Sequence, residues 1–216
     1  MHPAFSVIFL TTLIGTGQGF FVALYTEQVY STVELLPAQP NSFYTAGSVI
    51  ALALLIAGLV ASFFHLGHPE RAWRSAARWR TSWLSREVIV LPALMVAVAA
   101  YGLVHHFGLR LGIFGIETTL HGDLALVVGA GGVALAFLLF LCTGMIYACI
   151  KFLQEWATWL TVVNYTLFGL ASGFLLATAY AAYRAPALIY FYGVWTIIAT
   201  LAVMVTRVAS LIRNRR

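Results

Sequence analysis

The fold is decided by apolar stretches such as residues 124–150, LALVVGAGGVALAFLLFLCTGMIYACI, a run without a single charged residue. About 20 mostly apolar residues suffice for a helix to cross the hydrocarbon core of a bilayer. Five further stretches have this character: Pro3–Tyr25, Tyr44–Phe64, Val88–Phe107, Trp156–Tyr183 and Ala185–Thr206. The sequence therefore predicts an all-α fold, a polytopic membrane helix bundle of six transmembrane helices, forming a single integral membrane domain over residues 1–216.

The composition supports a membrane protein. Hydrophobic residues make up 62% of the chain and charged residues 9%, whereas soluble domains carry about 25% charged residues. The same values exclude intrinsic disorder, which requires low hydrophobicity. The net charge of +5 comes from arginines between apolar spans, so we expect no nucleic-acid partner. Cys142 and Cys149 allow neither a disulfide framework nor a zinc site, and we expect buried free thiols and no metal.

Lysine and arginine predict the orientation, because cytoplasmic loops carry an excess of both. One side of the predicted bundle carries Arg71, Arg74, Arg78, Arg80, Arg86, Lys151, Arg207, Arg213, Arg215 and Arg216, and the other carries Arg110 and Arg184. This asymmetry predicts that both termini are cytoplasmic. The opening MHPAFSVIFL lacks a basic region before its apolar run, so we expect a retained first helix and not a signal peptide.

The block at residues 65–87, HLGHPERAWRSAARWRTSWLSRE, differs in composition from everything around it. His65 lies where the second span ends, and an imidazole there can donate or accept a hydrogen bond. Glu87 opens the third span, where the helix dipole favours a carboxylate; a purely structural role is the alternative. Ser82 or Ser85 is expected to cap that helix. The arginines of the block equally well set the topology and contact anionic lipid.

Two neutral polar residues, Gln18 and Asn164, lie inside predicted spans. Each can bond a neighbouring helix or line a ligand pocket. We expect a helix–helix hydrogen bond for Asn164 and leave both interpretations open for Gln18.

Two other functional classes remain as alternatives. A b-type cytochrome would need paired histidines, for which His105 or His106 with His121 is the available combination near the outer face. A small transporter or channel would need charges inside the membrane. Arg207, near the cytoplasmic end of its span, is the one that the sequence offers there.

Specific residues within the 65–87 block give a family resemblance. The residues are His65-Leu66-Gly67, Pro69, Arg71-Ala72, Ser75, Arg78, Ser82, Leu84-Ser85 and Glu87. Together they resemble the conserved block of the dimethyl sulfoxide reductase membrane-anchor family. The opening MHPAFSVIFLTT and the segment CTGMIYACIKFLQEW, residues 142–156, are more similar to the branch that serves cytoplasmic sulfite-oxidising molybdoenzymes.

The resemblance implies a set of partners and cofactors. A catalytic subunit would carry molybdenum bis-pterin guanine dinucleotide, and a second subunit would carry four iron–sulfur clusters. The anchor itself would hold no haem and would exchange electrons with ubiquinone or menaquinone. In the family, the residues matching His65 and Glu87 are implicated in quinone binding. We add Arg71 and Gln18 as quinone-binding candidates, and we assign Arg74, Arg78, Arg80 and Arg86 to partner docking.

The expected function is therefore that of a quinone-reactive anchor in a bacterial inner membrane, with its partners on the cytoplasmic face. Electrons would flow from sulfite into the quinone pool, and the alternative is the anchor of a dimethyl sulfoxide reductase that oxidises quinol. Quinone reduction requires a hydrogen-bonding group at a carbonyl and a nearby proton donor, roles suited to His65 and Glu87. Family members usually have eight spans and this chain has six, but the resemblance places the quinone site in the first four helices.

Overall fold

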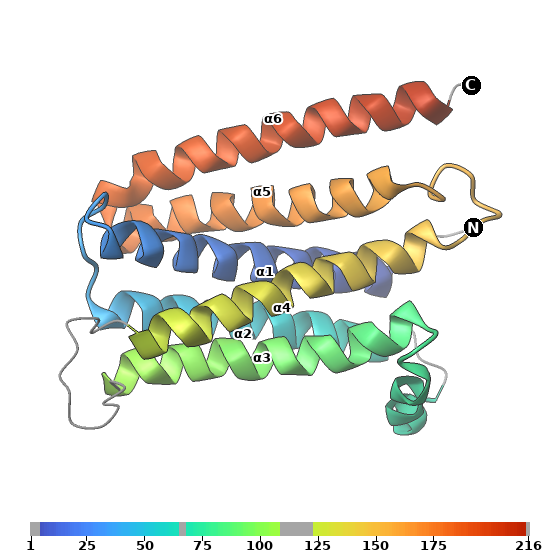
Figure 1. Cartoon of the computed structure of the whole chain (residues 1–216), viewed down its shortest axis with the longest axis horizontal. Coiled ribbons are helices and arrows are strands. Elements are labelled where there is room, and N and C mark those ends of the chain that lie inside the picture. Colours follow the sequence, from blue (N-terminus) through green and yellow to red (C-terminus); the bar gives the residue numbers. More distant parts are fainter. Residues whose placement is uncertain (1–4, 65–67, 109–122, 215–216) are drawn as a thin grey trace.

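The computed structural model describes residues 5–64, 68–108 and 123–214, and this part of the chain folds as a bundle of long helices (Figure 1). The elements are α1 (Phe5–Thr32), α2 (Asn41–Phe63), η1 (Pro69–Arg78), α3 (Trp83–Phe107), α4 (Asp123–Ala148), α5 (Trp159–Arg184), η2 (Pro186–Leu188) and α6 (Ile189–Asn214). The six α-helices are each long and apolar enough to cross a membrane. The predicted all-helical class is confirmed, and the described residues contain six helices that could span a membrane, the number that hydropathy predicted.

The helices lie side by side and alternate in direction (Figure 1). One end of the bundle, here called the basic end, carries η1, residues 149–158 and the last turn of α6. The other end, called the opposite end, carries residues 33–40 and η2. Helix α1 is central, because it packs against α2, α4 and α5, while α6 packs on α5 at the edge of the bundle.

Glycines allow α1 and α5 to approach closely. A Cβ atom on Gly19 would overlap the backbone of Gly169, and a Cβ on Gly173 would overlap the backbone of Gly19. Small residues at such positions let helix backbones meet in a membrane, where packing replaces the hydrophobic driving force. The spacing of four between Gly169 and Gly173 therefore marks a true helix interface.

Several helix ends differ from the limits set by hydropathy. Helix α1 continues to Thr32, seven residues past Tyr25, and this extension places Glu27 and Gln28 inside the helix and buried. Helix α6 likewise continues to Asn214. Hydropathy marks the hydrocarbon core, whereas a helix ends where its backbone finds a cap or a turn. Cys149 is exposed, contrary to the expectation of two buried thiols, because α4 ends just before it.

The start of α3 corrects the predicted position of Glu87. Ser82 is the N-cap, and its Oγ accepts a 3.4 Å hydrogen bond from the backbone N–H of Ser85. The Ser85 hydroxyl donates to the carbonyl of Ser75, which holds η1 against α3. Glu87 therefore lies in the second turn of α3 and does not open it. The dipole effect is concentrated in the first turn, so it does not account for a carboxylate here.

Candidate functional site

The centre of the candidate site is a hydrogen-bonded pair from two helices. Glu87 on α3 is half-buried, and Thr143 on α4 is 3% exposed. The Thr143 hydroxyl donates a 2.5 Å hydrogen bond to Oε1 of Glu87. An ionisable residue within a membrane span is costly to bury and usually has a functional reason. The pair also ties α3 to α4 at the basic end.

Two tyrosines complete the surroundings of the carboxylate. Tyr147 lies one turn beyond Thr143 on α4, and Tyr165 lies on α5. Both lie close enough to Glu87 to interact with it electrostatically, and Tyr165 also interacts with Thr143. The Tyr165 hydroxyl donates a 3.3 Å hydrogen bond to the carbonyl of Thr11 on α1. The carboxylate thus has one bonded hydroxyl, from Thr143, and interacts with a tyrosine from each of α4 and α5.

A cavity of about 550 Å³ adjoins this cluster at the basic end. It is lined by Val7, Ile8, Thr11, Tyr147, Glu155, Trp156, Thr161, Asn164, Tyr165, Phe168, Arg207, Ser210, Leu211 and Asn214. Small-molecule sites usually measure about 300–1,000 Å³, so the volume suits a ring-sized ligand. Glu87 does not line the cavity itself. Tyr147 and Tyr165, which interact with Glu87 electrostatically, form part of the wall.

The cavity wall offers several hydrogen-bonding groups. Asn164 on α5 donates a 2.9 Å hydrogen bond to the hydroxyl of Ser210 on α6. The expected helix–helix bond of Asn164 is confirmed, yet its Oδ1 has no partner among the described residues and its side chain also lines the cavity. With Arg207 and Tyr165, the wall combines an amide, a guanidinium and a phenol with apolar surface.

A smaller cavity of about 280 Å³ continues between α1 and α5. It is lined by Thr11, Thr12, Gly15, Tyr165, Phe168, Gly169 and Ser172. Thr11, Tyr165 and Phe168 line both cavities. Since the remaining lining residues lie further along both helices, the second cavity leads from the first toward the middle of the bundle. Gly15 leaves room there because it has no side chain, whereas the space beside Gly169 is filled by the ring of Phe140.

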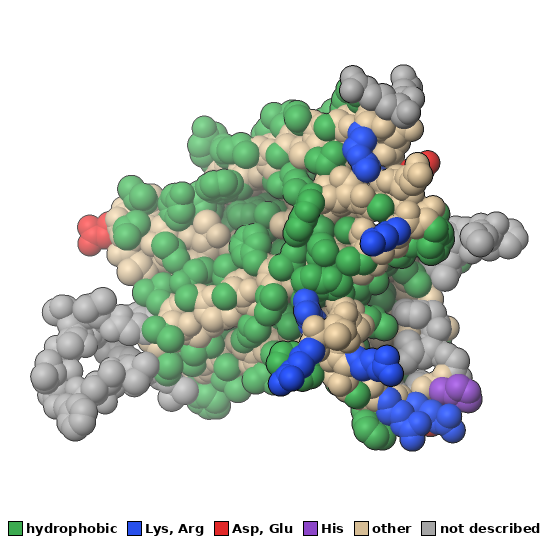
Figure 2. All heavy atoms as spheres, turned by 45° about the vertical axis from the view of Figure 1, so that its right-hand side comes forward, with side chains coloured by type: hydrophobic (Ala, Val, Ile, Leu, Met, Phe, Trp, Pro, Cys, Tyr) green, Lys and Arg blue, Asp and Glu red, His purple; other side chains and the backbone are tan. Residues whose placement is uncertain are grey.

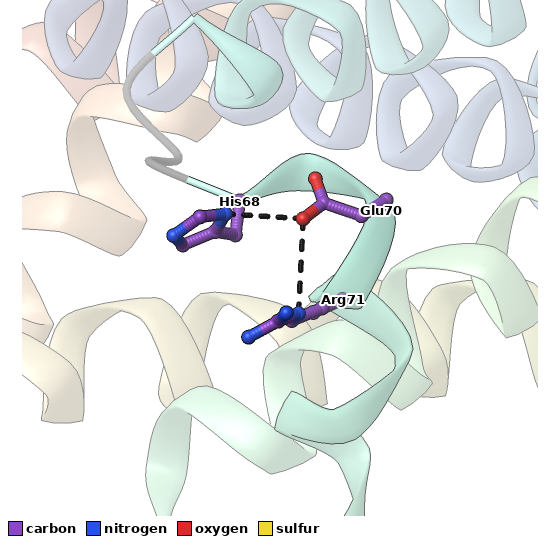
Figure 3. A network of polar contacts seen from close by, with 3 residues as sticks. All are labelled: His68, Glu70 and Arg71. Atoms are coloured by element: carbon purple, nitrogen blue, oxygen red, sulfur yellow. Dashed lines mark hydrogen bonds and ion pairs between the residues drawn. The ribbon is translucent and has the colours of Figure 1, made fainter.

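The predicted quinone-binding residues that the structure describes do not lie together. His65 lies outside the described residues. Arg71 is exposed on η1, and its Nε lies 3.8 Å from Oε1 of Glu70, which also contacts Nδ1 of His68 at 3.0 Å (Figure 3). Arg71 is therefore paired at the surface and not beside Glu87. Figure 3 shows the three side chains grouped on the outer loop.

Gln18 is also separate from the cavities. It is fully buried on α1, and neither its Oε1 nor its Nε2 has a hydrogen-bond partner among the described residues. It is not among the residues that line either cavity. Of the predicted quinone-binding residues that the structure describes, Glu87 is the one that lies beside the cavity.

Arg86 holds its own loop together. Its Nε donates to the carbonyl of Trp79 at 3.0 Å, and its Nη2 donates to the carbonyl of Arg80 at 2.9 Å. Its guanidinium also lies over the ring of Trp83, 4.2 Å from the centroid. These contacts fold the connection between η1 and α3, so Arg86 has a structural role that its assignment to partner docking did not foresee.

The other docking arginines remain available at the surface. Arg74, Arg78 and Arg80 are exposed on or just after η1. Arg74 lies over Trp73 and Arg80 over Trp79, at 5.5 Å and 5.4 Å from the ring centroids, and both tryptophans are themselves exposed. Figure 2 shows Lys and Arg side chains gathered on this end of the molecule. The basic end therefore presents a cationic and aromatic surface.

The histidine considered for haem binding has other contacts. His105 lies on α3 near the opposite end of the bundle and is 6% exposed. Its Nδ1 lies 3.4 Å from Oδ1 of Asn41, and its ring stacks on Tyr44 with centroids 4.4 Å apart. His121, its predicted partner, lies outside the described residues. His105 is thus packed between α2 and α3 side chains.

Reasoning from the sequence missed Thr143, Tyr147 and Tyr165. A signal for the first two was present, because they lie four residues apart and so share one face of a helix. A hydroxyl group in an apolar helix commonly bonds a backbone carbonyl of the same helix, so neither residue stood out as part of a site. Only the packing of α3, α4 and α5 brings these side chains to Glu87.

The helices, the half-buried carboxylate of Glu87 and the adjoining cavities define a multi-pass membrane protein with a candidate ligand site at one end. The whole chain, residues 1–216, matches the family model of the DMSO reductase anchor subunit (DmsC). The chain therefore belongs to this family, which confirms the resemblance carried by the 65–87 block. No solved structure matches the chain.

A curated relative supports the narrower resemblance. The chain is 57% identical over 216 residues to a sulfite dehydrogenase subunit of Allochromatium vinosum. The match covers 100% of this chain and 66% of the relative's length. The chain is thus similar along its whole length to a protein named as a sulfite dehydrogenase subunit.

Proposed function

We propose that this chain is the quinone-reactive anchor subunit of a molybdopterin oxidoreductase, and that it passes electrons from an iron–sulfur subunit to the quinone pool during sulfite oxidation. The observation that carries the proposal is the Glu87 carboxylate, bonded to Thr143 and flanked by Tyr147 and Tyr165 at the wall of a 550 Å³ cavity. Membership of an anchor family supports it.

The residues of the cavity fit the chemistry of a quinone. Its reduction consumes two electrons and two protons, so each carbonyl oxygen needs a hydrogen-bond donor and a source of protons. The second N–H of the Asn164 amide and the Arg207 guanidinium are donors in the wall, and the Tyr165 hydroxyl would become one by turning its proton from the Thr11 carbonyl to the ligand. Glu87 would hold a proton next to the wall, and Thr143 and Tyr165 would connect it to the ligand. His65 follows Phe64, where α2 ends at the basic end, and is proposed as a second ligand to the head group.

The smaller cavity suits the rest of the molecule. An isoprenoid tail needs an apolar path to the lipid, and the space between α1 and α5 extends from the larger cavity past Gly15 and Gly169. The head group would then lie at the basic end and the tail would run toward the middle of the bundle. Either ubiquinone or menaquinone satisfies these requirements.

The partners are proposed to dock at the basic end. Electrons must reach the quinone from a nearby cluster, and the exposed Arg74, Arg78 and Arg80 lie at the same end as the cavity. Positive side chains there complement acidic patches on a partner. The subunit with four iron–sulfur clusters would bind this surface and would connect the anchor to the molybdenum-containing catalytic subunit.

The concentration of Lys and Arg at the basic end favours placing that end on the cytoplasmic face of the bacterial inner membrane. The name of the relative favours sulfite as the electron source. The family description favours the alternative, the anchor of a DMSO reductase that oxidises quinol. The two assignments differ in the direction of electron flow through the same cavity.

The test is the His65→Ala substitution in the complex assembled with its soluble subunits. We expect loss of sulfite-dependent quinone reduction, while reduction of a soluble artificial acceptor by the catalytic subunit persists. His106→Ala is the matched control, because His106 is exposed at the opposite end. Normal quinone reduction by the His65→Ala complex would overturn the assignment of this residue.

A further inference from the structure

A second carboxylate, fully buried, lies at the other end of the bundle. Glu27 is 0% exposed, in the part of α1 that extends beyond the predicted span. Among the described residues, the Tyr44 hydroxyl lies close enough to bond the carboxylate, but neither carboxylate oxygen has a hydrogen bond of good geometry. Buried polar groups are almost always satisfied in native proteins, so these oxygens require a further partner besides Tyr44.

The groups that face Glu27 come from three other helices. Tyr44 of α2, Tyr101 of α3 and Tyr192 of α6 each interact electrostatically with it. All three are buried, with exposed fractions of 4%, 0% and 0%. The Tyr101 hydroxyl is already engaged, because it donates a 2.6 Å hydrogen bond to Oε1 of Gln28.

His105 and Tyr192 also carry buried polar atoms without a hydrogen-bond partner among the described residues, close to Tyr44 and Tyr101. The His105 ring lies 4.4 Å from the ring of Tyr44 and 4.7 Å from that of Tyr101, between centroids. Its Nε2 has no hydrogen-bond partner among the described residues, and neither has the hydroxyl of Tyr192. Unpartnered polar atoms from α1, α3 and α6 therefore surround one aromatic cluster, and all three side chains are at least nine-tenths buried.

Within the described residues, no cation compensates the carboxylate. The ion pairs found there involve Glu70 at the basic end, and none includes Glu27. The side chains facing Glu27 are phenols, which are neutral, and the nearby imidazole is buried. An isolated ionised carboxylate in such surroundings is so costly that the group takes up a proton instead.

We propose that Glu27 is a proton-binding site, in which a carboxylic acid is hydrogen-bonded to the neighbouring Tyr44 and, through internal water molecules, to His105 and Tyr192. Buried waters typically bridge polar groups that would otherwise lack partners. A metal cation fits less well, because it would need several oxygen ligands, whereas the cluster offers one carboxylate. The proposal does not rest on quinone binding, since Glu27 and Glu87 lie at opposite ends of the bundle.

Such a group holds a proton inside the membrane and can exchange it through hydroxyls and water. Ionisable residues inside membrane spans commonly serve in proton relays. Glu27 would therefore make the opposite end of the bundle a place of proton uptake and release, separate from any chemistry at the basic end.

Infrared difference spectroscopy of the full chain in lipid vesicles tests the proposal. We expect the spectrum of the natural chain minus that of Glu27→Gln to contain the C=O stretch of a protonated carboxylic acid at neutral pH, shifted in deuterated water. Glu34→Gln is the matched control, because Glu34 follows on the same segment and is exposed; its difference spectrum should show only carboxylate bands. Carboxylate bands alone for Glu27, or bands that respond to sodium, would overturn the proposal.

A second variant keeps the test decisive if Glu27→Gln does not fold. Tyr44→Phe preserves the buried ring and removes the hydroxyl that interacts with Glu27. In natural chain labelled with ¹³C-glutamate, the acid band should move with the isotope, and Tyr44→Phe should change its frequency. The band should persist in Glu87→Gln. An acid band that disappears in Glu87→Gln, or is unaffected by Tyr44→Phe, would contradict a protonated Glu27.

Discussion

The hydroxyl of Thr143 lies 2.5 Å from Oε1 of Glu87 and donates a hydrogen bond that joins α4 to α3. This bond orients the carboxylate in the second turn of α3, away from the helix terminus that Ser82 caps. The carboxylate is thereby presented to Tyr147 and Tyr165, which line the cavity. Thr143 is accordingly a positioning residue for Glu87.

Replacement of Glu87 should affect proton transfer more than assembly. Glu87→Gln keeps the shape of the side chain and an oxygen that accepts from Thr143, but it removes the ionisable group. We expect slower quinone turnover with a weaker dependence on pH. The measurement is the pH–rate profile of sulfite-dependent quinone reduction by the complex. An unchanged profile would assign Glu87 a purely structural role.

The substitution Thr143→Val should weaken the same function indirectly. Valine has nearly the shape of threonine, but it leaves the Glu87 oxygen without its donor. A hydrogen bond to a charged or strongly polar group is worth about 1.5 kcal/mol, so quinone turnover should fall about tenfold. Thr143→Ser should restore the rate, because it retains the hydroxyl. Equal losses with valine and serine would mean that packing matters and the hydrogen bond does not.

Tyr165 should contribute to quinone affinity. Tyr165→Phe removes the hydroxyl that lies between Thr143 and the cavities while the ring remains in place. We expect a KM for quinone that rises about tenfold, corresponding to the loss of one hydrogen bond of ordinary strength. Tyr183→Phe is the control, since Tyr183 is 86% exposed at the opposite end of α5. If Tyr165→Phe and Tyr183→Phe have the same KM for quinone, the Tyr165 hydroxyl does not contribute to quinone binding.

The close approach of α1 and α5 should make Gly19 intolerant of a side chain. A Cβ at Gly19 would overlap the carbonyl of Gly169, so Gly19→Ala should lower the free energy of unfolding by about 1–3 kcal/mol or more. Gly131→Ala is the matched control, because a Cβ there meets nothing within 4 Å. Thermal unfolding in detergent should show a lower midpoint for Gly19→Ala alone. Equal unfolding midpoints for the two variants would mean that α1 and α5 can move apart to admit the side chain without loss of stability.

The proposed orientation can be measured by labelling single cysteines in intact cells. Ala77 is exposed on η1 at the basic end, and Ala38 is exposed between α1 and α2 at the opposite end. The background must carry Cys149→Ser, because Cys149 is exposed. An impermeant thiol reagent applied from outside should label Ala38→Cys and spare Ala77→Cys. The reverse pattern would place the basic end, and the partners proposed for it, outside the cytoplasm.

The predictions from the sequence succeeded where a local property was sufficient. Six spans were expected and six helices are observed, and Ser82 was one of two expected caps. The helix–helix bond of Asn164 was also expected, although its partner Ser210 was not identified. Family membership followed from the residues of the 65–87 block, and the family model confirms it over the whole chain.

The predictions were incomplete where a role depends on neighbours from other helices. Arg71 and Arg86 belong to the same block, yet one pairs with Glu70 at the surface and the other binds the backbone of its own loop. Hydropathy places Glu27 after the end of the first span, because a charge usually marks the membrane boundary. In the folded chain it is buried, since tyrosine side chains from α2, α3 and α6 reach that turn of α1.

The sequence by itself determined that the chain is a helical membrane protein, how many spans it has and how positive charge divides between its ends. Those properties follow from hydropathy and from the cost of leaving backbone groups unpaired in lipid, which act on each segment separately. Only the tertiary structure decided that Thr143, Tyr147 and Tyr165 gather around Glu87 and that a cavity opens beside them. Contacts between helices depend on which faces pack together, and in a membrane that choice is made by close packing and a few hydrogen bonds.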